Sequence, residues 1–278
     1  MQCRYRERIT ICGDWMYGEV HPTWRPAGKR RGRFRETSET QQKLNDRAAR
    51  IRLVTTALAN FHRGDYALHL TYSDEELPED AEGFERDIRN AVARLRRKYR
   101  KAGAELKYII VRGWSGKGRP HVHMLISGGI GREALEDCWG HGRANCDRLE
   151  FDENGIADLV DYMAGQKDDG KAGEGHARAK GERRWSGSRN LKKPVERTNL
   201  TRYSKAACEE IADAGNPHKL FADRYPGYWL SEFPDVRLNP VTHAWEMSFV
   251  LYRPDSPDLA EYARRERRSV HAGKQARP

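Results

Sequence analysis

The sequence predicts an α+β protein, and three features of its middle part carry that prediction. Residues 66–72 (YALHLTY) are aromatic and aliphatic and precede an acidic turn, as expected of a strand. Residues 82–100 repeat apolar side chains at helical spacing, with arginines on the other face. Residues 106–112 and 121–127 are two apolar strands joined by a turn with three glycines at 113–119, which predicts an antiparallel hairpin.

Weaker patterns predict the remaining elements. Residues before 40 are expected to be irregular, and residues 40–60 to form a basic helix. Leu44, Ala48, Ile51 and Leu58 can share one face of that helix. Residues 165–194 form a polar, glycine-containing stretch that we expect to be a loop. The other expected elements are a short helix near 131–138, a strand at 146–151, a helix at 155–164 and a strand at 244–252.

Composition favours a polyanionic partner in the cytoplasm. The 278 residues carry 51 Lys+Arg against 41 Asp+Glu, a net charge of +10, and each neutralised phosphate of a nucleic acid releases counterions. No apolar run approaches the roughly 18 residues of a spanning helix, and no signal peptide is recognisable, so we expect no membrane partner. Five cysteines, an odd number without a C-x-x-C pair, predict reduced thiols and a cytoplasmic protein.

His121-Val122-His123 is a candidate metal-binding pair. Side chains at i and i+2 of a strand leave the same face, roughly 6.5–7 Å apart at the backbone, so two imidazoles can converge on one ion. The spacing alone is weak, because short motifs of this kind also arise by chance. The otherwise apolar strand strengthens the case, since buried histidines need polar partners and a cation would be one.

Tyr162 is a candidate nucleophile in the helix predicted at 155–164. It lies beside the apolar stripe, which consists of Ile156, Leu159, Val160 and Met163, so it can extend from a packed helix. A tyrosine at such a boundary, with a solvated hydroxyl, is the ordinary alternative. A phenol in water loses its proton only near pH 10, so a tyrosine nucleophile needs a nearby cation or base.

Two basic segments are candidate DNA contacts. Residues 24–35 (WRPAGKRRGRFR) hold six basic residues between two aromatics and are either a strand-tracking arm or a solvated tail. Near the second, RRWSGSRNLKKP, basic residues surround a tryptophan, a combination that suits single-stranded DNA but also occurs on ordinary surfaces. The residues of this second cluster are Arg183, Arg184, Trp185, Arg189, Lys192 and Lys193.

Taken together, four segments resemble the HUH endonuclease superfamily, and within it the rolling-circle replication-associated proteins of bacterial mobile elements such as plasmids and phages. They are GDYALHLTY (64–72), LKYIIVRGWSGKGRPHVHMLIS (106–127), GIADLVDYMAGQ (155–166) and RRWSGSRNLKKP (183–194). Their order and spacing agree with the family, so the resemblance covers roughly residues 40–195. Residues beyond 200 are not covered.

The resemblance implies a fold, a chemistry and roles for particular residues. The fold is an antiparallel sheet of about five strands flanked by helices, close to an RNA-recognition-motif or ferredoxin-like arrangement. The chemistry is attack of a tyrosine on a DNA phosphodiester with Mg²⁺ or Mn²⁺, which gives a 5′-phosphotyrosine and a free 3′-hydroxyl. By position, His121 and His123 are metal ligands and Tyr162 is the nucleophile.

Two departures from the family pattern bear on activity. The family usually has a Glu eight or nine residues before the first histidine, where this chain has Gly113 and Arg112. We expect His69 as a substitute ligand, and a three-histidine site favours Mn²⁺ or a softer metal over Mg²⁺. The family's lysine three residues after the tyrosine is also missing, and Lys167 is the candidate replacement.

The sequence therefore predicts a metal-dependent nickase and ligase that acts on a single-stranded or hairpin origin. Lys117 and Arg119, on the hairpin turn, are further candidate phosphate contacts. The chain has no Walker loop, so a separate helicase and host replication proteins are expected partners. The alternative is a non-catalytic nucleic-acid-binding protein on the same fold, and a metal-dependent RNA-processing enzyme is a third, weaker interpretation. The expected domains are a basic N-terminal arm and helix (1–60), a nicking domain (61–200) and an extension of unknown role (201–278).

Overall fold

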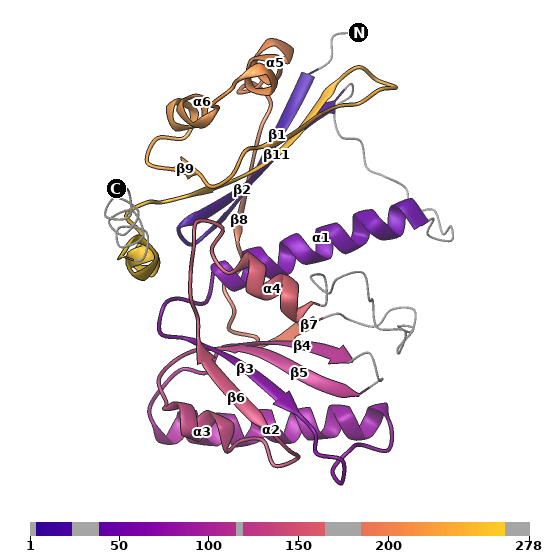
Figure 1. The fold of residues 1–278 in the computed structure, drawn as a ribbon, viewed down its shortest axis with the longest axis vertical. Coiled ribbons are helices and arrows are strands. Elements are labelled where there is room, and N and C mark those ends of the chain that lie inside the picture. The colour runs from indigo at the N-terminus through magenta and orange to yellow at the C-terminus, as the bar shows by residue number, and fades with distance from the viewer. Residues whose placement is uncertain (1–3, 24–38, 115–118, 165–184, 265–278) are drawn as a thin grey trace, which may run out of the picture. The chain divides into compact units, whose positions relative to one another are not determined.

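A computed structural model describes residues 4–23, 39–114, 119–164 and 185–264 of the chain (Figure 1). It confirms the α+β class, with two antiparallel sheets. Contacts divide the chain into two units. The central unit comprises residues 60–150 and 156–192, and the terminal unit comprises residues 1–59, 151–155 and 193–278.

The central unit is built on a sheet with the order β6-β3-β5-β4-β7. Its first four strands and two helices follow one another as β-α-β-β-α-β, and the sheet order of those strands is the ferredoxin-like one that we expected. The elements are β3 (Tyr66–Thr71), α2 (Ala81–Lys101), β4 (Tyr108–Trp114), β5 (Pro120–Ile126), α3 (Arg132–Glu136), β6 (Ala144–Arg148), α4 (Ala157–Met163) and β7 (Trp185–Gly187).

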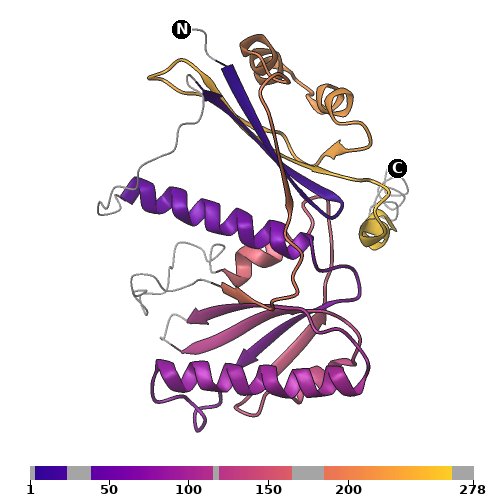
Figure 2. The ribbon, with the colours of Figure 1, turned by 180° about the vertical axis from the view of Figure 1, so that it is seen from behind.

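Helix α2 covers one face of this sheet, and α4 lies on the opposite face (Figures 1 and 2). The α2 helix starts at Asp80, whose carboxylate accepts a hydrogen bond from the Gly83 amide at 2.7 Å. Its apolar stripe packs on alternate strand residues, among them Leu70, Val122 and Met124. The residues between these therefore point to the other face, where the histidines lie.

The terminal unit has its own sheet, with the order β10-β11-β2-β1-β8, and β9 pairs with β11. Its core lies between the sheet and two helices, α5 and α6, and includes Phe221 and Phe249, whose ring centroids are 4.8 Å apart. The elements are β1 (Arg4–Cys12), β2 (Trp15–Thr23), α1 (Glu39–Leu58), β8 (Val195–Asn199), α5 (Lys205–Asp213), α6 (His218–Arg224), β9 (Trp229–Leu230), β10 (Asp235–Leu238), β11 (Trp245–Tyr252) and a 3-10 turn (Pro257–Leu259).

The expectation of an irregular N-terminus is wrong for residues 4–23, which form the hairpin β1-β2. Strand β1 escapes sequence patterns because Glu7 occupies a buried position and is only 1% exposed. Arg202 donates to both Glu7 carboxylate oxygens, at 3.0 and 3.1 Å, and the Tyr225 hydroxyl donates to one of them. These partners are distant in sequence, so only the tertiary structure satisfies the buried charge.

Two further expectations need correction. The buried face of α1 consists of Leu53, Val54, Ala57 and Leu58, whereas Ala48 is exposed. The strand expected at 146–151 is β6, two residues earlier, because its pairing with β3 places Cys146 beside Leu68. Among the described residues, no helix combines the length and the apolar character needed to cross a membrane.

Candidate metal centre

Strand pairing brings three histidines together on the face of the central sheet that α2 does not cover. His69 of β3 pairs directly with His123 of β5, and Thr71 pairs with His121. Directly paired residues of an antiparallel sheet share a face, and so do residues two apart on one strand. All three imidazoles therefore leave the same face in adjacent positions.

The three rings are close enough to share one ion. Their ligand atoms all lie within 4.8 Å of one another, so the cluster can hold a metal ion. The His69 and His123 rings stack with centroids 4.4 Å apart and an interplanar angle of 9°. His121 meets His123 edge to face, with centroids 5.0 Å apart.

The electrostatics of the cluster favour neutral imidazoles. Burial lowers the pKa of His123 to about 3, and neighbouring His69 and His121 lower it further. Burial is also the main cause of the lowered pKa values of His69 and His121. A neutral imidazole keeps the lone pair that a metal requires.

The His69 ring leaves one polar atom without a partner. Its Nε2 is buried and has no hydrogen-bond partner among the described residues. His121 Nδ1 lies 3.5 Å from the Arg119 carbonyl, and a proton on Nδ1 would leave the lone pair of the ring on Nε2. A bound cation would satisfy the His69 atom, so the cluster fits a metal ion, and three nitrogen donors suit Mn²⁺ or a softer divalent metal better than Mg²⁺.

Gly113 explains how the site is arranged without the family's glutamate. It pairs with His121 across the β4-β5 hairpin, and a Cβ atom there would lie 2.2 Å from His121 Nε2. The imidazole therefore occupies the space that a side chain at position 113 would need. Arg112 faces α2 instead, where Glu85 accepts from its Nη2 at 2.9 Å and also from its Nε. The described histidine cluster contains no carboxylate ligand.

Tyr162 lies beside the histidines. Helix α4 buries Val160 and Met163, and Tyr162 on another side of the helix is 60% exposed. Its ring is 5.6 Å from the His123 ring and meets it edge to face, at 73°. The structure thus brings an accessible phenol next to the cluster.

Trp185 shares the face of the cluster. It pairs with Val111 of β4, and Val111 pairs with His123 of β5, so the three side chains form a row across the sheet. Two strand spacings put Trp185 roughly 10 Å from His123 at the backbone. The indole is half-buried, so part of its surface is open for stacking.

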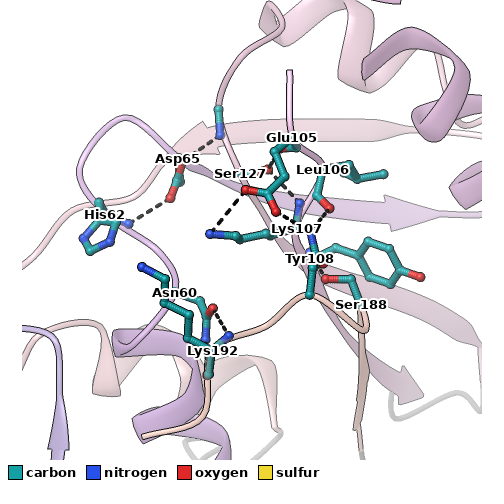
Figure 3. A network of polar contacts seen from close by, with 12 residues as sticks. Asn60, His62, Asp65, Glu105, Leu106, Lys107, Tyr108, Ser127, Ser188 and Lys192 are labelled. Carbon is teal, nitrogen blue, oxygen red and sulfur yellow. Dashed lines mark hydrogen bonds and ion pairs between the residues drawn. The ribbon is translucent and has the colours of Figure 1, made fainter. Parts of the chain in front are cut away.

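The basic residues after Trp185 are held at the other end of β4 (Figure 3). The Ser188 hydroxyl accepts from the Tyr108 amide at 3.2 Å. The Asn60 side chain donates to the Lys192 carbonyl at 2.8 Å and accepts from the Lys192 amide at 2.6 Å. Asn190 donates to the Leu106 carbonyl at 3.1 Å. Much of the S-R-N-L-K segment therefore anchors the chain to the sheet, a role that its composition did not reveal.

The other candidate DNA contacts are only partly described. Arg189, Lys192 and Lys193 are exposed, but the anchoring of their segment at the Tyr108 end of β4 does not join them to the histidine cluster. Arg119 is half-buried and forms an ion pair with Asp74. Lys117, Lys167, Arg183 and Arg184 lie outside the described residues.

Sequence reasoning missed Arg143, which precedes β6. Its charge contributes to the lowered pKa of His69, after burial and His121, so the guanidinium lies near the cluster. Its carbonyl accepts from the Thr71 amide at 2.9 Å, which fixes its backbone beside β3. Arg143 is exposed and so is available to a phosphate. No motif marked it, because its position depends on the pairing of β3 with β6.

Comparison with known families agrees with this part of the chain. Residues 65–167 match the model of a family of replication-associated proteins, described by the name ORF2. The matched region runs from β3 through α4, so it contains all three histidines and Tyr162. The match is consistent with a replication initiator. No curated protein and no solved structure matches the chain.

Proposed function

We propose that this chain is a metal-dependent DNA nickase and strand transferase that starts rolling-circle replication or transfer of a mobile element. The observation that carries the proposal is the exposed Tyr162 ring, 5.6 Å from His123 in a three-histidine cluster that can hold a metal ion. The match to replication-associated proteins supports the same function.

In the proposed reaction, the Tyr162 hydroxyl oxygen attacks the phosphorus of a DNA phosphodiester. A bond forms between this oxygen and phosphorus while the bond from phosphorus to the 3′-oxygen breaks. The phenol loses its proton, the 3′-oxygen gains one, and the 5′-phosphate stays on the tyrosine. The number of phosphate ester bonds is conserved, so the 3′-hydroxyl can later reverse the step and rejoin the strand.

His69, His121 and His123 would hold the metal ion, which would polarise the scissile phosphate and offset its developing negative charge. The burial that lowers the pKa values of the three histidines keeps them in the form that binds a cation. Lys167, after α4, is a further candidate for assisting the tyrosine.

The proposed substrate is single-stranded DNA, either free or in a hairpin origin. Trp185, in the row of His123 and Val111, offers a base-stacking surface on the face of the site. Arg143, near His69, and Arg119, which precedes the histidine strand, are placed to neutralise phosphates. A separate helicase and host replication proteins would complete replication.

A second candidate function is non-catalytic nucleic-acid binding on the same fold. The observation that favours it is the lack of a carboxylate in the described cluster, because hard ions such as Mg²⁺ prefer oxygen ligands. The two candidates differ in one respect that can be measured, which is the covalent adduct.

The test uses end-labelled single-stranded DNA from the region flanking the gene, incubated with Mn²⁺ or with EDTA and run on a denaturing gel. A metal-dependent nick with a protein–DNA adduct, both lost in Tyr162→Phe, is the expected result. Tyr228→Phe is a matched control, because Tyr228 is a half-buried tyrosine of the terminal unit that stacks with Arg253. Binding of the same DNA without nick or adduct would favour the non-catalytic protein.

A further inference from the structure

The outer face of α2 carries a concentration of positive charge that the proposed nicking site does not use. From Ile88 to Lys101 the chain has seven basic residues and no acidic residue. Two of the basic side chains turn toward the protein, since Arg94 donates to the Cys138 carbonyl and Lys98 to the Ala134 carbonyl. The other five are exposed and form what we call the α2 basic stripe: Arg89, Arg96, Arg97, Arg100 and Lys101.

The α2 basic stripe is not balanced by nearby acids. Among the described residues, the only polar contact that these side chains make is from Arg96 to the neutral Tyr108 hydroxyl, at 3.1 Å. Arg96 and Arg97 lie four residues before Arg100 and Lys101, respectively, and like charges at this spacing repel each other on a helix. The negative end of the helix dipole favours cations in the last turn, but this effect does not extend back to Arg89. An external anion would relieve the repulsion along the whole stripe.

The stripe and the histidine cluster lie on opposite sides of the central sheet. Helix α2 packs on the face that includes Leu70 and Val122, whereas His69 and His121 leave the other face. Figures 1 and 2 show α2 along one side of this sheet. A ligand on the stripe is therefore distinct from a strand bound at the histidines.

The chemistry of the stripe selects among anionic partners. Both aromatic residues of α2, Phe84 and Tyr99, are buried, so the helix has no surface on which unpaired bases could stack. None of the large apolar side chains that are exposed in the described chain belongs to α2, so insertion into a lipid surface is not supported. Four of the five cations are arginines, which pair with phosphate in a bidentate manner.

We propose that the α2 basic stripe binds the phosphate backbone of double-stranded DNA without reading its sequence. From Arg89 to Lys101 the helix rises roughly 18 Å, so the five cations present an extended row to a regular array of phosphates. The binding surface is independent of nicking and would hold the duplex that adjoins a single-stranded or hairpin site.

The test measures the affinity for a 20-base-pair duplex of arbitrary sequence between about 50 and 200 mM salt. The variant combines Arg89→Gln, Arg97→Gln and Arg100→Gln, and its matched control combines Arg52→Gln, Arg197→Gln and Lys219→Gln, which are exposed cations on other elements. The stripe variant should lose roughly tenfold or more in affinity at 100 mM salt, and the slope of log affinity against log salt should fall by about 3.

Several outcomes would overturn the proposal. An equal loss in the control triple would mean that only net charge matters. No binding of the duplex by the wild type, or tighter binding of a duplex RNA or of anionic vesicles, would exclude double-stranded DNA as the partner. The three single substitutions, each expected to lower the slope by about 1, keep the test valid if the triple variant does not fold.

Discussion

Replacing Gly113 with alanine should abolish tight metal binding while leaving the protein folded. The added Cβ would lie 2.2 Å from Nε2, 2.7 Å from Cε1 and 2.8 Å from Cδ2 of His121. Carbon atoms in ordinary contact are about 3.5–4.0 Å apart, so the imidazole must rotate away from the cluster. The site then has two histidines in place of three.

The size of the effect follows from the number of ligands. Losing a partner outside the ligand set already costs about 10–100-fold in metal affinity, so losing a direct ligand should cost at least about 100-fold, or about 2.7 kcal/mol. Gly113 does not have a positive φ, and alanine is favoured over glycine within a strand by roughly 0.5–1 kcal/mol. The stability of the metal-free protein should therefore change by less than about 1 kcal/mol.

Calorimetric titration of the metal-free protein with Mn²⁺ measures the affinity, and urea unfolding measures the stability. Gly131→Ala is a matched control, because a Cβ atom at that position meets nothing within 4 Å. If Gly113→Ala bound Mn²⁺ as tightly as the Gly131→Ala variant, His121 would not be a ligand and the argument from Gly113 would fail.

Three further predictions test the cluster and the terminal unit. His69→Ala should weaken Mn²⁺ binding as much as His121→Ala, measured by the same titration, and an unchanged affinity would exclude His69 as the third ligand. The lowered pKa of His123 means that the unfolded chain takes up a proton below about pH 6.5 while the folded protein does not, so the metal-free protein should lose roughly 1 kcal/mol between pH 7 and pH 5.5, a loss that His123→Gln reduces. Arg202→Met leaves the Glu7 carboxylate buried without its cation and should lower the free energy of unfolding by about 3–5 kcal/mol in urea titrations.

Each of these three has a comparison that isolates its cause. His218→Gln changes an exposed histidine of the terminal unit and should leave both the Mn²⁺ affinity and the pH dependence as in the wild type. Lys205→Met removes an exposed ion pair with Glu209 and should cost less than about 1 kcal/mol. A loss for Lys205→Met as large as that for Arg202→Met would contradict the role of the buried charge.

The sequence determined the central unit well because its patterns are local. The strand at 66–72, the helix at 82–100 and the hairpin around His121 all follow from periodicity and turn residues, and the structure has each within two residues of its expected limits, except that β4 extends to Trp114. The α+β class and an antiparallel sheet of about five strands were predicted correctly for the same reason.

The three-histidine cluster was only partly visible in the sequence. The i, i+2 spacing of His121 and His123 marked them as a pair, and the absence of the family's carboxylate suggested His69. Only the register between β3 and β5 places His69 directly beside His123, and only the side-chain packing shows that the His121 ring fills the space above Gly113. Arg143 depends on the same register and carried no signal in the sequence.

The terminal unit was decided by the tertiary structure. Its sheet joins strands from both ends of the chain, and β1 contains a buried glutamate where a strand pattern requires an apolar residue. Arg202 and Tyr225 satisfy Glu7 from nearly 200 residues or more away in sequence, as no local pattern could indicate. A sequence records which groups are polar, but the partner that makes their burial tolerable is known only once the chain has folded.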